Sequence, residues 1–230
     1  MEKDFSEKEK IDLMVAEFER LKKGKIFERE KLKEIILRNK QALFKNDFIL
    51  KCIDEGTPGG IHLAGSGILI KDHQIVNWPI IKGITYHQNC GAVSLFAKEN
   101  NLSLEIDRLA ENFAKDISNR YKINFLGIHH LERPREFHNA LGIWVCNLPN
   151  FDFSLNSYLP PGFTINPFLV KDKEYTASEI NLALKIFKEH GFYLVDPKIN
   201  FYLWFLNVPA NDYLKFIQTD LNLEIVEINL

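Results

Sequence analysis

Two short segments that hold two of the three cysteines constrain this 230-residue chain more than any other part of it. The first runs from Cys52 through Asp54 into a glycine-rich stretch, and the second places His87 three residues before Cys90. Thiolate, imidazole and carboxylate groups are the side chains that bind zinc in proteins. The H-x-x-C spacing lets the start of one helical turn direct His87 and Cys90 at a single ion, with Cys52 as the third ligand.

The residues around these ligands predict two strands of an α/β sheet. An apolar run over residues 47–54 predicts a buried strand in which Cys52 and Asp54 point to the same side, and residues 81–87 predict a parallel strand that ends at His87. Open α/β sheets carry their active sites at the carboxyl ends of the strands. Three protein ligands leave a fourth position for water, which is typical of catalytic zinc, whereas structural sites usually fill all four positions with protein.

The order C-x-D, then an Ala-Gly segment, then H-x-x-C-G-A-V resembles the β-class carbonic anhydrases and their cadmium-using relatives over about residues 48–95. The resemblance implies that Cys52, His87 and Cys90 bind Zn²⁺, with cadmium able to replace it, and that Asp54 is the catalytic carboxylate. It implies a lyase that hydrates carbon dioxide reversibly to bicarbonate with a metal-bound water or hydroxide. It also implies a homodimer, because β-class enzymes are built from dimers.

The sequence departs from the family pattern at two places. The family has an arginine two residues after the aspartate, where this chain has Gly56, and the gap from Cys52 to His87 is shorter than usual. In the family, that arginine holds the carboxylate away from the metal, a role that suits its two-pronged hydrogen bonding. Asp54 would otherwise become the fourth ligand and close the site, unless another basic residue replaces the arginine: Lys51, His62, Arg133 or Arg135.

Three interpretations of these residues therefore stay open. The first is an open zinc site that hydrates carbon dioxide or hydrolyses another small linear substrate. The second is a non-catalytic metal site closed by Asp54. The third has no metal, and Cys52, His87 and Cys90 are unconnected buried residues, as lone cysteines most often are. Cys146 follows apolar residues and is predicted to be a small buried hydrophobe.

The rest of the chain predicts one α/β domain over residues 1–230, with a mainly parallel central sheet flanked by helices. Amphipathic helices over residues 7–23 and 27–39 form an N-terminal helical arm within residues 1–45, and we expect them to pack on the sheet or on a partner subunit. Residues 104–121 predict another amphipathic helix.

The C-terminal third predicts a loop, a helix and a β-α-β extension. Residues 151–170 are rich in proline and aromatic residues and predict an irregular loop, and a capping box from Thr176 to Glu179 predicts a helix that ends near His190. The extension consists of a strand over residues 200–208, a helix over 209–221 and a strand over 223–228.

Charge and hydropathy narrow the range of partners. The net charge of -2 offers no basic surplus to attract nucleic acid. The most apolar stretch, from Phe201 to Leu206, is far shorter than the roughly 20 residues of a membrane-spanning helix. The N-terminus is charged and has no apolar signal segment, so we expect a cytoplasmic protein whose partner is a small-molecule substrate rather than nucleic acid or a membrane.

Overall fold

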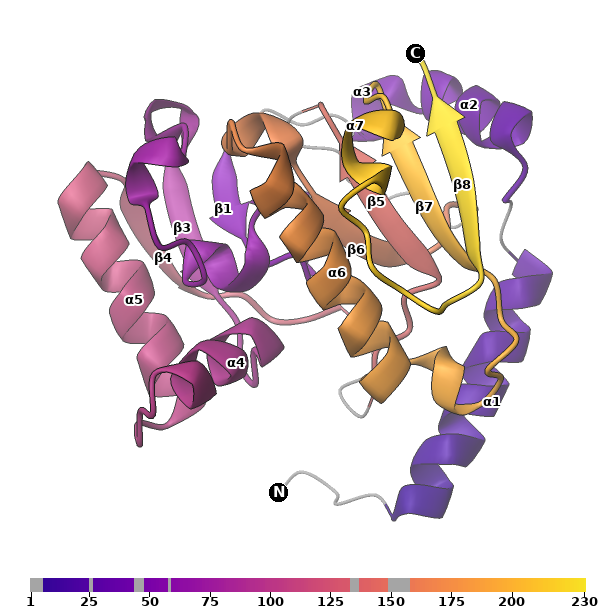
Figure 1. The fold of residues 1–230 in the computed structure, drawn as a ribbon, viewed down its shortest axis with the longest axis horizontal. Coiled ribbons are helices and arrows are strands. Elements are labelled where there is room, and N and C mark those ends of the chain that lie inside the picture. Colours follow the sequence, from indigo (N-terminus) through magenta and orange to yellow (C-terminus); the bar gives the residue numbers. More distant parts are fainter. Residues whose placement is uncertain (1–5, 25–26, 44–47, 58, 133–136, 149–157) are drawn as a thin grey trace.

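The fold is taken from a computed structural model that describes residues 6–24, 27–43, 48–57, 59–132, 137–148 and 158–230. Figure 1 shows an α/β protein whose strands, within these ranges, form two four-stranded sheets. All strand pairs in both sheets are parallel. The predicted fold class is confirmed, and the parallel strands are divided between two sheets.

The two sheets have the same connectivity. The first has the order β2-β1-β3-β4, and the second has the order β6-β5-β7-β8, so in each sheet the chain adds its second strand on one side of the first and its third and fourth strands on the other. The strands of the first sheet are β1 Ile49–Lys51, β2 Ile61–His62, β3 Gly83–Tyr86 and β4 Asn124–Ile128. Those of the second are β5 Gly142–Cys146, β6 Gly162–Ile165, β7 Phe201–Leu206 and β8 Leu223–Ile228.

Helices supply the crossovers that parallel strands require. Helices α4 (Gly91–Glu99) and α5 (Ile106–Tyr121) lead from β3 to β4, α6 (Lys173–His190) leads from β6 to β7, and α7 (Asn211–Leu214) lies between β7 and β8. Before β1 come α1 (Glu7–Gly24), α2 (Arg29–Arg38) and α3 (Lys40–Leu43), and α2 contacts β8. Thus α2 packs on the second sheet, and α1 contacts the 3₁₀ turn Phe192–Leu194 that follows α6 (Figure 1). Within the described ranges, every helix is too short or too polar to span a membrane.

The predicted start of the first helix at residue 7 is confirmed. Ser6 and Glu9 form a capping box there, because Glu9 accepts a hydrogen bond from the Ser6 backbone N–H at 2.8 Å and its own N–H donates to the Ser6 hydroxyl. The predicted start of α6 at Thr176 is wrong. Asp172 caps this helix instead, accepting hydrogen bonds from the N–H groups of Glu174 and Tyr175, so α6 begins at Lys173.

β2 ends at His62, and a short 3₁₀ turn, Ala64–Gly67, begins two residues later. Two other predictions about local structure are wrong. The predicted helix over residues 209–221 is reduced to α7. The predicted loop over residues 151–170 contains β6, a fully buried edge strand of the second sheet; residues 149–157 lie outside the described ranges.

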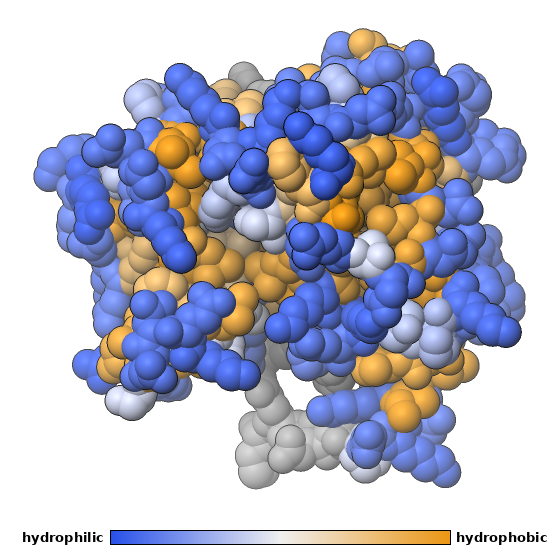
Figure 2. Space-filling model, viewed as in Figure 1, coloured by the Kyte–Doolittle hydropathy of each residue, from blue (hydrophilic) through white to orange (hydrophobic). Residues whose placement is uncertain are grey.

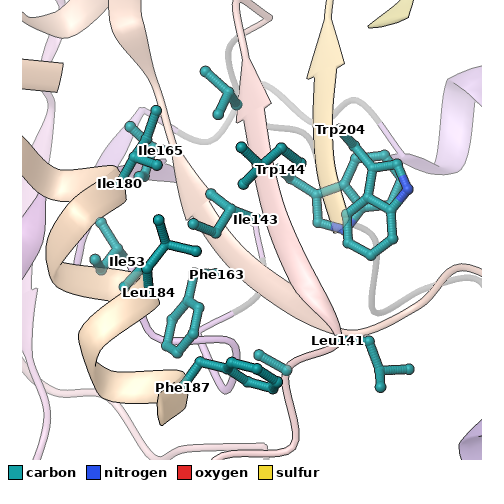
Figure 3. Packing of buried hydrophobic residues seen from close by; sticks show 14 of the residues in the cluster. Ile53, Leu141, Ile143, Trp144, Phe163, Ile165, Ile180, Leu184, Phe187 and Trp204 are labelled. Carbon is teal, nitrogen blue, oxygen red and sulfur yellow. The ribbon is translucent and has the colours of Figure 1, made fainter. Parts of the chain in front are cut away.

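The two sheets meet where β1 and β2 end. The backbone N–H of Thr164 in β6 donates to the carbonyl of Ile53 at 2.9 Å, and the His62 N–H donates to the Asn166 side chain at 2.8 Å. Figure 3 shows Ile53 in the same buried region as the α6 residues Ile180 and Leu184. One hydrophobic cluster therefore joins the second sheet to residues that follow the strands of the first sheet, Cys52 and Cys90 among them. The buried strand residues of the first sheet itself, Leu50, Ile61 and Ile84, belong to a second cluster.

Candidate metal centre

The three predicted ligands come from the carboxyl ends of two adjacent strands. Cys52 directly follows β1, His87 directly follows β3, and Cys90 is the last residue before α4. Because β1 and β3 pair in parallel, their carboxyl ends lie at the same edge of the first sheet. The chain therefore brings Cys52 together with His87 and with Cys90, which lies 38 residues further along the sequence, as the motif predicts.

The distances between these side chains suit a tetrahedral metal ion. One potential ligand atom from each of Cys52, His87 and Cys90 lies within 4.8 Å of the others, and all three residues are buried. The two sulfur atoms are 3.7 Å apart. Two thiolates bound at about 2.3 Å to one tetrahedral zinc ion would be about 3.8 Å apart. The buried Cys52/His87/Cys90 group could therefore hold a metal ion.

The orientation of the His87 ring also fits a metal ligand. Its Nδ1 donates to the Gln88 carbonyl at 2.9 Å, since a carbonyl can only accept, and Nε2 is buried without a hydrogen-bond partner among the described residues. Burial lowers the pKa of His87, but the negative charges of Cys52 and Asp54 raise it, to about 9. A site that attracts a proton this strongly to the imidazole also attracts a metal cation.

The thiolates lie next to backbone N–H groups. The Gly65 N–H donates to the Cys52 sulfur at 3.3 Å. The hydrogen bond from Cys52 lowers the pKa of Cys90 most, burial opposes it, and the Val93 and Ala92 N–H groups in the first turn of α4 lower it further. The hydrogen bond to Cys90 and burial raise the pKa of Cys52, so Cys90 is the first of the pair to lose its proton.

Cys146 behaves as the sequence predicts, as a buried thiol. It is fully buried, its sulfur donates to the Leu148 carbonyl at 3.5 Å, and burial raises its pKa to about 12. It ends β5, the second-sheet strand that corresponds to β1 in connectivity. The residues that follow β7, from Asn207 to Ala210, contain neither histidine nor cysteine, so the second sheet repeats the topology without the ligand set.

Asp54 lies beside the cysteine group and belongs to a second group of side chains. Its Oδ1 accepts a hydrogen bond from the Gly56 N–H at 2.9 Å, and its Oδ2 lies 3.9 Å from Nδ1 of His138. The same His138 nitrogen lies 2.9 and 3.0 Å from the two carboxylate oxygens of Glu55. Within the described ranges, Asp54, Glu55 and His138 form one group of potential ligands, and the Cys52/His87/Cys90 group contains no carboxylate.

The basic residues that could replace the family arginine differ in where their side chains lie. The His62 ring is engaged elsewhere, because its Nδ1 donates to the Cys52 carbonyl at 2.7 Å. Lys51 is buried, and its side chain passes close to Gly60. Arg133 and Arg135 lie outside the described residues. Sequence reasoning missed Glu55 and His138, and no local pattern could have joined two residues so far apart in the chain.

A left-handed turn, Ala64–Gly67, lies against the ligands. Gly65 and Ser66 have φ near 55°, and Gly67 has φ of 96°. These left-handed conformations cannot continue a strand, so β2 ends at His62, two residues before the turn. A Cβ at Gly65 would lie 2.7 Å from Ile68 and 3.2 Å from Ala92 in α4, so only glycine allows this close approach. Gly65 thus allows close packing of the turn against α4 beside the site.

Comparison with known proteins adds no family to this description. No protein-family model, curated protein or solved structure matches the chain. The molecule is an α/β protein with parallel sheets and a buried Cys-His-Cys group that could hold a metal ion.

Proposed function

We propose that the chain is a zinc-dependent lyase, similar to the β-class carbonic anhydrases, that hydrates carbon dioxide reversibly to bicarbonate. The observation that carries this proposal is the convergence of one potential ligand atom each from Cys52, His87 and Cys90 within 4.8 Å, at the carboxyl edge of a parallel sheet. The 3.7 Å sulfur separation and the orientation of His87 support zinc as the ion.

The residues of the chain have separate tasks in this proposal. When bound, zinc supplies a Lewis acid that makes water nucleophilic near neutral pH, although two thiolate ligands weaken this effect. Cys52, His87 and Cys90 hold the ion, and the N–H groups of Gly65 and the first turn of α4 stabilise the thiolate charges. Asp54 is the carboxylate that accepts or orients a proton beside the ion.

The missing arginine has a structural counterpart in this chain. Gly56 stands at the position of the arginine, and its backbone N–H donates to Asp54 Oδ1. The His138 imidazole lies on the other side of the same carboxylate, 3.9 Å from Oδ2. These two contacts support an Asp54 that is held away from the metal, as the arginine would hold it.

A closed, non-catalytic site would require Asp54 as the fourth ligand. The grouping of Asp54 with Glu55 and His138 instead favours the open site. A hydrolase of another small linear substrate would use the same residues, so assays of ester hydrolysis alongside carbon dioxide hydration distinguish the two reactions.

The role of Asp54 can be tested by replacing it with asparagine. Asp54→Asn is expected to keep its zinc and to lose roughly 10²- to 10⁴-fold in carbon dioxide hydration, the usual contribution of general acid-base catalysis. Stopped-flow hydration between about pH 7 and 9, the range around a zinc-water pKa, measures the rate. Asp116→Asn is the control, because Asp116 is exposed on α5 and pairs with Arg120 of the same helix.

Loss of zinc from Asp54→Asn would show that the carboxylate is a ligand and would support the closed site. Wild-type activity with normal zinc content would show that Asp54 is not the catalytic carboxylate.

We expect the protein to form a homodimer. Met14, Phe18 and Leu21 of α1 are buried in the chain itself, whereas three other apolar residues of α1 are 40 to 43% exposed: Ile11, Leu13 and Val15. Figure 2 shows apolar side chains exposed beside the lower part of α1. Light scattering at working concentration should give twice the 26.8 kDa mass of one chain, and a mass of one chain would contradict this prediction.

A further inference from the structure

Glu179 is a buried carboxyl group that the catalytic proposal does not use. It lies on α6 with 3% of its surface exposed, and its Oε1 accepts a hydrogen bond from the Ala64 N–H at 2.7 Å and another from the Tyr175 hydroxyl at 3.2 Å. Burial raises its pKa to about 8, against the lowering effect of these two hydrogen bonds. Asp172 already caps α6, so Glu179 has no capping role there.

Ala64, which donates the hydrogen bond to Glu179, is the first residue of the left-handed turn Ala64–Gly67. Ser66 has φ of 56°, a conformation that costs a non-glycine residue roughly 1 to 3 kcal/mol. Two further hydrogen bonds hold the turn, from the Ser66 N–H to the Leu63 carbonyl and from the Ser66 hydroxyl to the Thr85 carbonyl, both at 2.8 Å. The turn is strained and needs such anchors to persist.

The turn contacts the surroundings of all three ligands. The Gly65 N–H donates to the Cys52 sulfur. Thr85, which anchors Ser66, precedes His87 by two residues in the chain, and Ala92, which packs on Gly65, follows Cys90 by two residues. A shift of the turn would therefore remove the hydrogen bond to Cys52 and loosen the packing beside the other two ligands.

We propose that Glu179 is a positioning residue for the metal centre, which fixes the turn through Ala64 so that the Gly65 N–H donates to the Cys52 thiolate. The inference rests on the proposed metal site and adds to it a residue from the helix that covers the second sheet. Groups that orient metal ligands typically contribute 10- to 100-fold to metal affinity.

The acceptor atom of Glu179 can be removed while its volume is nearly kept. Glu179→Met is expected to lower zinc affinity 10- to 100-fold, measured by competition with a chelator of known affinity. Glu179→Gln retains an oxygen that can accept from Ala64, so its affinity should stay within about threefold of wild type by the same reasoning. In the cobalt-substituted protein, the thiolate-to-metal absorption band should shift in Glu179→Met and stay in place in Glu179→Gln.

Leu184→Ala is the matched control, because Leu184 is also buried on α6 and its truncation destabilises the helix while leaving Glu179 in place. Its zinc affinity and cobalt spectrum should equal those of wild type. If Glu179→Met does not fold, Ser66→Ala tests the same turn at its Thr85 anchor and should weaken zinc binding about 3- to 10-fold.

The outcomes separate this inference from the proposed function. A wild-type protein that binds no zinc overturns the metal site itself. A wild-type protein that binds zinc, together with unchanged affinity and spectrum in folded Glu179→Met or in Ser66→Ala, overturns only the positioning role. An equal loss of affinity in Leu184→Ala and Glu179→Met also overturns it, because general destabilisation of α6 would then explain the effect.

Discussion

Replacing Cys90 with serine is expected to remove the bound metal, while the same replacement at Cys146 leaves it in place. Zinc content should fall from about one ion per chain to nearly none in Cys90→Ser, because a hydroxyl does not ionise near neutral pH and cannot replace the thiolate. Carbon dioxide hydration should fall with it, to the level of buffer.

The two cysteines make an unusually close comparison. Both are buried, and both stand at the carboxyl end of a strand or just before a helix in sheets of the same connectivity. They differ in their surroundings: Cys90 has a second sulfur at 3.7 Å and backbone N–H groups that lower its pKa, whereas burial raises the pKa of Cys146 to about 12. Only Cys90 is placed to lose its proton and bind a cation.

The measurement is elemental analysis after purification under reducing, zinc-supplemented conditions, followed by a zinc titration of each variant. Normal zinc content in Cys90→Ser would remove Cys90 from the ligand set. Loss of zinc from Cys146→Ser, with its fold intact by circular dichroism, would show that the second sheet contributes to the metal site.

The Cys52/His87/Cys90 group could be predicted from sequence because each member belongs to a short local pattern. Cys52 and His87 each end an apolar run that predicts a strand, and Cys90 stands three residues after His87, so parallel pairing alone was enough to bring the three together. The helices over residues 7–23 and 104–121 were predictable for the same reason, since capping and a period of 3.6 are local signals.

The supporting residues could not be predicted because their partners are distant in the chain. Glu179 stands three residues after Thr176 and so imitates a capping box, but its carboxyl group bonds to Ala64, 115 residues away. Glu55 and His138 are 83 residues apart. The early end of β2 at His62 was equally out of reach of local patterns, because the left-handed conformations of Gly65 and Ser66 depend on contacts with α4 and α6.

Glu179→Gln is expected to remove a large pH dependence from the stability of the protein. Burial raises the pKa of Glu179 from 4.5 to about 8, so between these values the folded protein holds one proton more than the unfolded chain. The free energy of unfolding therefore falls as pH rises, by about 1.4 kcal/mol per unit and by as much as roughly 5 kcal/mol over the whole interval. The contribution is fully present below about pH 4.5 and is lost as pH passes through 8.

Glutamine has no proton to lose, so the corresponding slope is absent from the variant. The two proteins should differ little in stability near pH 5, and Glu179→Gln should be the more stable by several kcal/mol near pH 8.5. Urea unfolding of both proteins at intervals between these pH values, with excess zinc throughout, isolates the carboxyl group because all other titrating groups are common to both. The neighbouring Tyr175 does not contribute, since burial and Glu179 raise its pKa well above this range.

Glu189→Gln is the control, because Glu189 is exposed near the end of the same helix and its replacement should leave the slope of wild type unchanged. Parallel stability curves for wild type and Glu179→Gln would mean that Glu179 titrates like an exposed carboxyl group and is not held in the buried contact with Ala64. Stability curves that coincide near pH 5 and diverge as pH rises would place the extra proton on Glu179. In that case the turn beside Cys52 is anchored by a neutral carboxyl group at neutral pH, which is why glutamine is expected to replace it without loss of zinc.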